Sequence, residues 1–248
     1  MKKLRIIQFS FIILFIVGLR PGLAGDITIH IDDVKGVREI EIGGGKSNVG
    51  ITSGCIEGSG KGKTDKRQAS SFNSVLVDGA FDVNIEMQKK EGVEVSGDDN
   101  IIPNITTKVS GNKLIVSSNK SICPKQKLEV NISAPDIEQV RMEGSSDIII
   151  TGVNNKSLTV ELDGSGDINV SGKTKKFAVT VSGSGNIHAK DLQAEDTSIS
   201  ITGSGDADVY AARKLDGAIE GSGNINYYGN PKEVSKKIDG SGDIEKKD

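Results

Sequence analysis

Short stretches in which apolar and polar residues alternate recur from about residue 72 to the end of the chain. Leu158, Val160 and Leu162 alternate with polar residues, and Ile199 and Ile201 continue the pattern further along. A period of two is typical of β-strands that bury one face. No window here combines a helical period with helix caps, so the pattern predicts an all-β protein.

A five-residue motif of the form Gly-Ser-Gly-Asp/Asn-Ile follows these strand patterns six times. Its copies begin at Gly144, Gly164, Gly183, Gly203, Gly221 and Gly240, so the period is 18 to 20 residues. The first copy carries Ser146 at the third position, and the fourth carries Ala207 at the fifth. A repeat of this regularity indicates stacked structural units.

The period favours a right-handed parallel β-helix, or solenoid, with about 19–20 residues per coil and the GSG[DN]I motif as corner turn. Each coil would lay its strands on those of the coil before it, about 4.8 Å away. Glycine permits a corner with positive φ and close stacking of neighbouring backbones. A β-propeller needs about 40 residues per blade, which is twice this period. An antiparallel sandwich remains the second alternative.

The repeat divides the chain into three parts. Residues 72–248 are expected to form the solenoid, because Phe72 to Ile85 resemble a repeat whose GSG has become Gly-Ala-Phe. Residues 25–71 predict two short strands and a Gly/Lys-rich stretch that would cap the end of the solenoid. Residues 1–24 read as a secretory signal peptide: basic residues precede an apolar run, and Gly22-Leu23-Ala24 offers a cleavage site after Ala24. An uncleaved membrane anchor is the alternative.

Without residues 1–24 the chain has 27 basic and 34 acidic residues, a net charge of −7. This disfavours nucleic acid and anionic membrane surfaces as partners. There is no Trp and there are three Tyr, so few platforms for stacking sugars are expected.

Several segments together resemble one family. These are Phe72 to Ile85, Ser133 to Ile137, the GSG[DN]I series and Tyr228 to Pro231. They are similar to bacterial proteins with a head GIN domain, a family described as putative auto-transporter adhesins. The resemblance implies a β-helical fold and an exported or envelope location, and it implies no catalytic residues. Many members look like lipoproteins, but Cys55 lies some 30 residues beyond Ala24 and cannot be the lipidated residue of this signal.

Cys55 and Cys123 are the two cysteines. In an exported chain an even number suggests a disulfide, here closing a loop of about 70 residues and worth about 4 kcal/mol in the chain-entropy model. Two free thiols are the alternative.

The fourth motif position should form a column if coils stack. Its members are Asp147, Asp167, Asn186, Asp206, Asn224 and Asp243. Asn separates most of the acids, which favours a turn ladder in which these side chains cap backbone N–H groups. A weaker hypothesis places calcium at Glu143, Asp147, Asp163 and Asp167, on two adjacent coils.

The remaining chemistry-bearing residues have simple interpretations. His30 precedes two aspartates, and His188 follows an apolar strand residue; both are interpreted as surface histidines, since no zinc spacing appears. Tyr227-Tyr228 is interpreted as one core residue beside one exposed residue.

The sequence therefore predicts a non-enzymatic, adhesin-like binding or scaffold protein of the cell envelope with no cofactor. It would be periplasmic, on the outer-membrane surface or extracellular. Its partner would be a protein or glycan, and a homo-oligomer stays open. Alternatives are a periplasmic envelope or stress-related structural component and a polysaccharide lyase or hydrolase, which needs paired carboxylates.

Overall fold

The structure is a computed structural model that describes residues 27–34, 37–42 and 50–248, with side chains from residue 54 onward. The predicted signal peptide lies outside the described residues. The chain forms two compact units. The first comprises Met1–Glu57 with Lys120–Cys123, and the second comprises Gly58–Asn119 with Pro124–Asp248.

The first unit contains two small sheets. Strands β1 (Ile27–Val34), β2 (Val37–Ile42) and β3 (Gly50–Ser53) form an antiparallel sheet. Strands β4 (Ile56–Glu57) and β11 (Ile122–Cys123) pair in parallel. The alternating isoleucines predicted two strands before residue 43, and the structure adds β3 as their neighbour.

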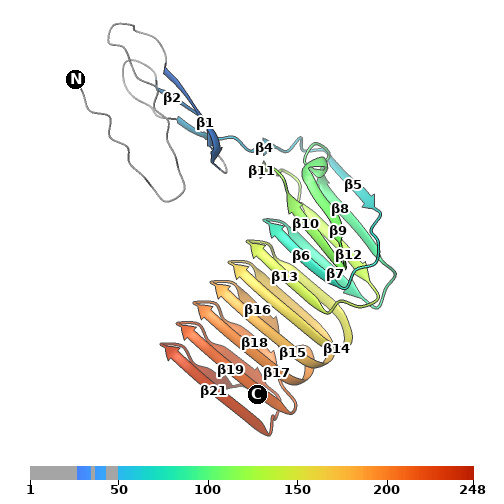
Figure 1. Cartoon of the computed structure of the whole chain (residues 1–248), viewed down its shortest axis with the longest axis vertical. Helices are drawn as coiled ribbons and strands as arrows, with labels where there is room; N and C mark the ends of the chain where they lie inside the picture. The colour runs from blue at the N-terminus through green and yellow to red at the C-terminus, as the bar shows by residue number, and fades with distance from the viewer. Residues whose placement is uncertain (1–26, 35–36, 43–49) are drawn as a thin grey trace, which may run out of the picture. The chain divides into compact units, whose positions relative to one another are not determined.

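The second unit is a β-solenoid built from two long sheets (Figure 1). The first sheet runs in the order β9 (Ile105–Ser110), β10 (Lys113–Ser118), β6 (Ser74–Gly79), β13 (Gln139–Gly144), the second halves of β14 (Ile148–Gly164) and β15 (Asp167–Gly183), β17 (Leu192–Gly203), β19 (Lys214–Gly221) and β21 (Glu233–Gly240).

The second sheet runs in the order β5 (Gly62–Arg67), β8 (Gly92–Asp98), β12 (Glu129–Ala134), β7 (Asp82–Met87), the first halves of β14 and β15, β16 (Asn186–Ala189), β18 (Ala207–Tyr210), β20 (Ile225–Tyr228) and β22 (Ile244–Lys246).

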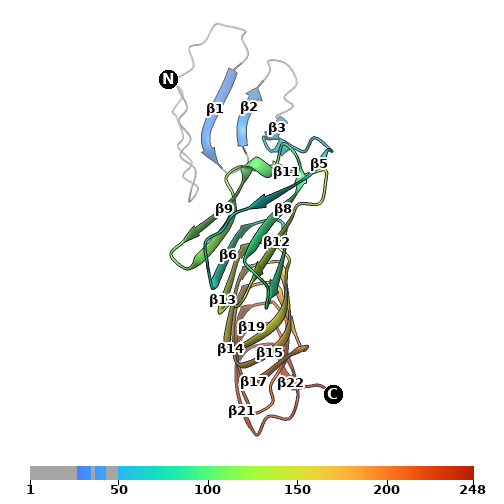
Figure 2. The ribbon, with the colours of Figure 1, turned by 90° about the vertical axis from the view of Figure 1, so that its right-hand side faces the viewer.

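One coil consists of a strand of the first sheet, a corner and a strand of the second sheet. Along the stack from β6 and β7 to β21 and β22, neighbouring coils pair in parallel, so that Val160 lies beside Val179 and Val179 beside Ile199. These side chains and their equivalents are buried between the two sheets. Figure 2 shows the coils stacked on one another along the solenoid. The predicted all-β parallel solenoid is confirmed.

Each corner depends on its first and third motif residues. Gly203 has φ +128°, and a Cβ added there would lie 2.2 Å from the carbonyl oxygen of Gly183 in the coil before. The N–H of the next residue, Ser204, donates to that same oxygen at 2.9 Å. A Cβ at Gly205, the third position, would lie 2.1 Å from the carbonyl oxygen of Gly185. Only glycine allows stacking this close.

The first copy departs from glycine at its third position because the coil before it differs. The Ser146 hydroxyl accepts a hydrogen bond from the Phe81 N–H at 3.3 Å and donates to the Gly79 carbonyl oxygen at 3.2 Å. Ser146 is buried. It therefore fills space at the junction where the regular motif begins.

The N-terminal end of the solenoid unit is antiparallel, which the repeat did not predict. β5 pairs antiparallel with β8, β8 with β12, and β9 with β10. The 3-10 helix η1 (Ile102–Asn104) turns the chain between β8 and β9. The second unit includes residues from Gly58 onward, and β5 joins its second sheet.

A buried carboxylate fixes this end. Asp98 is completely buried and accepts hydrogen bonds from the backbone N–H groups of Gly60 at 2.7 Å, Lys125 at 2.8 Å and Gln126 at 3.0 Å. The bond from Gln126, followed by those from Gly60 and Lys125, lowers the pKa of Asp98 below its ordinary value. Three chain segments thus meet at one side chain.

Candidate functional site

Polar side chains form a row across the outer face of the second sheet. The row follows the strand register through Asn84, Ile149, Asn169, His188, Asp208 and Asn226. Ile149 is 46% exposed and is one of the few large apolar side chains on the described surface. The parallel stacking therefore places one outward-facing residue of each coil on a common line, and all of these residues except Ile149 are polar.

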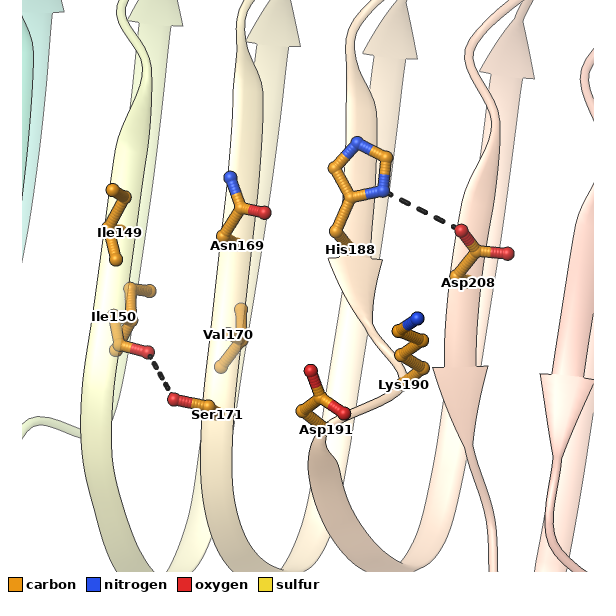
Figure 3. A pocket seen from close by; sticks show the side chains of 9 residues that line it. All are labelled: Ile149, Ile150, Asn169, Val170, Ser171, His188, Lys190, Asp191 and Asp208. Atoms are coloured by element: carbon orange, nitrogen blue, oxygen red, sulfur yellow. Dashed lines mark hydrogen bonds and ion pairs between the residues drawn. The ribbon is translucent and has the colours of Figure 1, made fainter.

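A shallow hollow of about 490 Å³ lies over the centre of this row. His188 and Asp208 line it from adjacent strands, with Nδ1 of His188 3.6 Å from a carboxylate oxygen of Asp208 (Figure 3). Lys190 and Asp191 line the same hollow from the turn that follows β16. The hollow therefore offers a histidine, two carboxylates and an ammonium group to solvent.

A second hollow of about 470 Å³ shares Lys190 and Asp191 with the first. Tyr210 and Tyr228 line it, side by side in the register of β18 and β20. A ring carbon of Tyr210 lies 3.2 Å from where a Cβ of Gly229 would be, so glycine at 229 makes room for this ring. We call the two hollows together the second-sheet groove.

The rim of the groove near β22 carries paired charges. Lys247 lies 2.7 Å from Glu245, and this hydrogen bond raises the pKa of Lys247 and lowers that of Glu245. The ammonium group of Lys246 donates to Asn230 at 2.7 Å. In the described part of the chain Lys190 has no hydrogen bond or ion pair of this kind. It is therefore the cation of the groove that remains open to a ligand.

The six residues of the fourth motif position form a continuous ladder. A side-chain oxygen of each accepts the backbone N–H of the next, at 3.0 Å for Asp147 and Asp167 and at 2.8 Å for Asp206 and Asn224. The other steps are Asp167 to Asn186, Asn186 to Asp206 and Asn224 to Asp243. The asparagines also donate: Asn186 Nδ2 bonds Asp167 Oδ1 at 2.9 Å. These residues therefore hold successive corners together.

The structure places the four acids of the calcium hypothesis on adjacent coils, with Glu143 in register with Asp163. Glu143 is bound to Arg141 at 2.7 Å, and one oxygen of Asp147 is occupied by the Asp167 N–H. Among the described residues the group of Glu143, Asp147, Asp163 and Asp167 does not bring three ligand atoms within 4.8 Å of one another. Calcium binding by these residues therefore stays a prediction.

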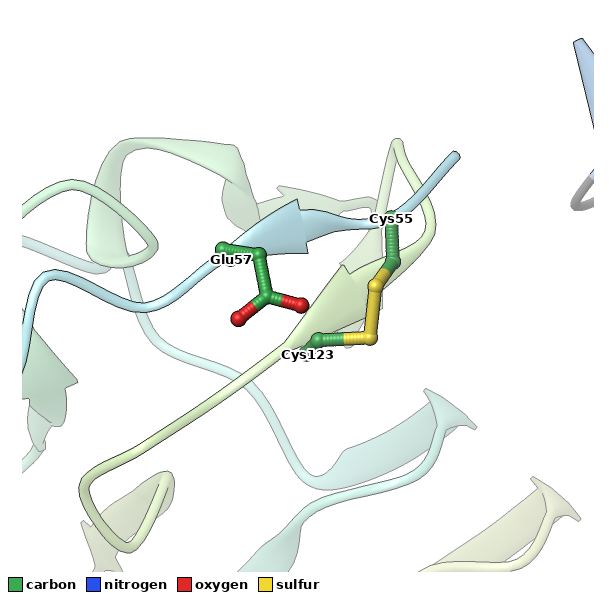
Figure 4. A group of neighbouring side chains, drawn as sticks. All are labelled: Cys55, Glu57 and Cys123. Carbon is green, nitrogen blue, oxygen red and sulfur yellow. A yellow bond between two sulfur atoms is a disulfide. The ribbon is translucent and has the colours of Figure 1, made fainter. Parts of the chain in front are cut away.

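Cys55 and Cys123 are joined by a disulfide between β4 and β11, with Cα atoms 5.6 Å apart (Figure 4). Both residues belong to the first unit. Glu57 lies beside the disulfide. Sulfur atoms bonded to each other do not act as thiolate ligands, so this group does not constitute a metal site.

The structure also places the tyrosine pair Tyr227-Tyr228 and the histidine of β1. Tyr227 is buried and Tyr228 faces outward, while His30 lies on β1 opposite Glu39. The pairing of Tyr228 with Tyr210 was not predicted from the sequence. Both tyrosines stand four residues after the ladder residue of their own coil, so aligning the repeats by that position reveals the pair.

The repeating corners, the ladder and the groove define a β-solenoid with a polar outer face. The chain belongs to the family described as "putative auto-transporter adhesin, head GIN domain", whose model matches residues 71–231. The proteins with curated descriptions include none with detectable sequence similarity.

Three of the crystal structures to which this chain is similar illustrate the likeness. A putative adhesin from Bacteroides fragilis is 26% identical over 77% of this chain and all of its own, with a TM-score of 0.66. A putative lipid binding protein from Parabacteroides distasonis is 25% identical over 79% of this chain and all of its own, with a TM-score of 0.50. A putative adhesin from Parabacteroides merdae, 22% identical over 78% of this chain and 99% of its own, with a TM-score of 0.50, shares the fold.

In the part of the chain that the structure describes, no helix combines the length and the apolar character that a membrane crossing requires.

Proposed function

We propose that this chain is an exported, non-enzymatic and adhesin-like binding protein of the cell envelope, and that the second-sheet groove is its contact surface. The observation that carries the proposal is the groove, which crosses successive coils and presents Asn169, His188, Lys190, Asp191 and Tyr228 on one face. The family description and the Bacteroides fragilis neighbour support an adhesive role.

The architecture suits binding rather than chemistry that requires movement. The groove rests on strands whose corners are fixed by backbone hydrogen bonds such as Ser204 N–H to Gly183 O at 2.9 Å. A surface held this rigidly loses little conformational entropy when a partner docks. The residues on it are therefore pre-arranged for recognition.

A second candidate follows from the Parabacteroides distasonis neighbour, which is described as a putative lipid binding protein. The second-sheet groove fits this less well, because amide and charged side chains line it alongside Ile149 and Ile150. An acyl chain favours an enclosed apolar cavity. Binding of neutral phospholipid vesicles by the purified chain would favour this candidate.

Location on the cell decides between the adhesive role and a periplasmic structural role. Intact cells are treated with a membrane-impermeant amine reagent, and the chain is then recovered and its lysines are mapped. Labelling of Lys190 on intact cells is expected. Protection of every lysine until the outer membrane is opened would contradict an outward-facing adhesin and favour the periplasmic component.

A further inference from the structure

The second-sheet groove contains polar groups that the fold does not use. The amides at either end of the row are committed: Asn84 donates to Asn131 at 2.9 Å, and Asn226 donates to Asp208 at 3.0 Å. Between them, among the described residues, the side chain of Asn169 has no hydrogen bond of this kind, and neither has that of Lys190. These free donors and acceptors are spaced one coil apart.

The same groove holds two neighbouring tyrosine side chains. Tyr210 and Tyr228 are two of the three tyrosines in the chain, and they stand on adjacent strands of one face. Both are half-buried, so each ring is held in place by its surroundings while part of it stays open. Paired aromatic rings with hydroxyl groups at their tips accept ligands that are apolar on one side and polar at the edge.

The charged side chains that line the groove are three of each sign: Lys190, Lys246 and Lys247 against Asp191, Asp208 and Asp248. Asp208 lies next to His188 on the adjacent strand (Figure 3). The cation Lys247 at the rim is paired with Glu245 at 2.7 Å. A strongly anionic ligand would meet the carboxylates of Asp191 and Asp208, and a strongly cationic one would meet Lys190. The groove therefore matches a ligand without net charge.

We infer that the second-sheet groove binds a neutral glycan. This inference rests on the proposed binding function and names its ligand class. Sugar C–H faces pack on Tyr210 and Tyr228, while hydroxyl groups exchange hydrogen bonds with Asn169, Lys190 and Asp191. Carboxylate and amide groups suit hydroxyl-rich ligands, because each accepts or donates in more than one direction.

The absorbance and fluorescence of the tyrosines can be used to measure glycan binding. Because the chain has no Trp and three Tyr, its near-ultraviolet absorbance and fluorescence come chiefly from tyrosine, and two of the three rings line the groove. The full mature chain is titrated with linear oligosaccharides of glucose, mannose or N-acetylglucosamine. We expect a saturable change in the tyrosine spectrum with at least one series, and an affinity that high salt leaves unchanged.

Substitutions separate stacking from folding. Tyr228→Ala and Tyr210→Ala are each expected to weaken binding about tenfold, which corresponds to loss of about 1.4 kcal/mol. Tyr228→Phe keeps the ring and is expected to bind within about twofold of the wild type. Ser200→Ala, on the outer face of the first sheet, is the matched control and should bind like the wild type. Far-ultraviolet circular dichroism checks that each variant is folded.

The results of these experiments distinguish the glycan inference from the proposed binding function. No response to any neutral oligosaccharide, or equal affinity of the Tyr210→Ala/Tyr228→Ala double variant, overturns the glycan inference. Salt-sensitive binding of polygalacturonate or of an envelope protein in place of neutral sugars would also overturn it. Attachment of the purified chain to isolated cell envelopes is measured in parallel. If the tyrosine variants attach as well as the wild type, the proposed binding function is supported without the glycan inference. If the wild type does not attach, both the binding function and the glycan inference are contradicted.

Discussion

Asp98 shows how one side chain holds several segments of the solenoid unit at its N-terminal end. Its carboxylate accepts three backbone N–H groups from residues 27 to 38 positions away, and it is fully buried. Removing the carboxylate would take the acceptor from all three N–H groups at once. A charged acceptor with three donors is among the stronger hydrogen-bonded arrangements in proteins.

This carboxylate predicts a pH dependence of stability. The pKa of Asp98 is lowered in the folded state, first by the Gln126 N–H, so Asp98 contributes stability above its unfolded pKa of about 4. That contribution is lost as the pH falls through the lowered folded value. We expect Asp98→Asn to lower the midpoint of urea-induced unfolding at pH 7. Between pH 5 and pH 2 this midpoint should fall less steeply for the variant than for the wild type.

The matched control is Asp99→Asn, which removes a carboxylate bonded to the Ser59 hydroxyl instead of the three N–H groups. It should leave the midpoint at pH 7 close to the wild-type value. Equal pH profiles for Asp98→Asn and the wild type would show that Asp98 does not carry this dependence. The role of Asp98 was invisible in the sequence, because its partners follow no repeated spacing.

At the level of the coil, the ladder residues convert a sequence repeat into a chain of hydrogen bonds. Asn186 occupies the middle, where its Nδ2 donates to Asp167 and its Oδ1 accepts the Asp206 N–H at 2.9 Å. Alternating Asn with Asp lets one side chain donate where two carboxylates would repel. The ladder thus depends on its order as well as on its composition.

Asn186→Asp tests that order. The change removes the donor to Asp167 and creates four consecutive aspartates, so we expect a loss of about 1–2 kcal/mol at pH 7. Most of the loss should disappear at high ionic strength, which screens the repulsion between the carboxylates. Asn186→Ala removes the hydrogen bonds without adding charge and serves as the comparison. A loss for Asn186→Asp that is the same at low and at high ionic strength would argue against repulsion.

The elements that repeat were predictable, and those that do not repeat were not. Alternation and the 18 to 20-residue period predicted the parallel strands from β13 onward, because each coil carries the same local pattern. β5, β8 and β9 lie outside the repeat, so nothing in the sequence showed that they pair antiparallel. In the groove, His188 was placed correctly on a surface, whereas the Tyr210–Tyr228 pair emerged only once strand register was known.

On the scale of the molecule, the edge strand β21 carries a charge where its neighbours carry core residues. Lys236 is in register with Gly217, which is in register with the buried Ile199. Its ammonium group donates to the Ile244 carbonyl oxygen at 2.6 Å and lies 5.1 Å from the centre of the Tyr227 ring. Inward-facing charge on an edge strand discourages pairing with another chain.

Replacing Lys236 with Ile should therefore promote self-association. Val234 and Ile238 on the same strand are 42% and 43% exposed, and Lys236→Ile would join them into an apolar strip. We expect sedimentation velocity to show a concentration-dependent rise in mass for this variant. Lys237→Ile, on the outward-facing side of β21, is the control, and equal behaviour of the two variants would contradict the role of Lys236.

The corner contacts also govern how such a protein can change in length. Each corner bonds to the corner before it through the same atoms, as Ser204 does to Gly183 and Ser222 to Gly203. Duplicating one whole coil would reproduce every one of these contacts, whereas adding a few residues would displace all the later rows of the groove. Each added coil would lengthen the polar row by one residue. The length of the groove and the length of the ligand that it can hold would therefore increase together.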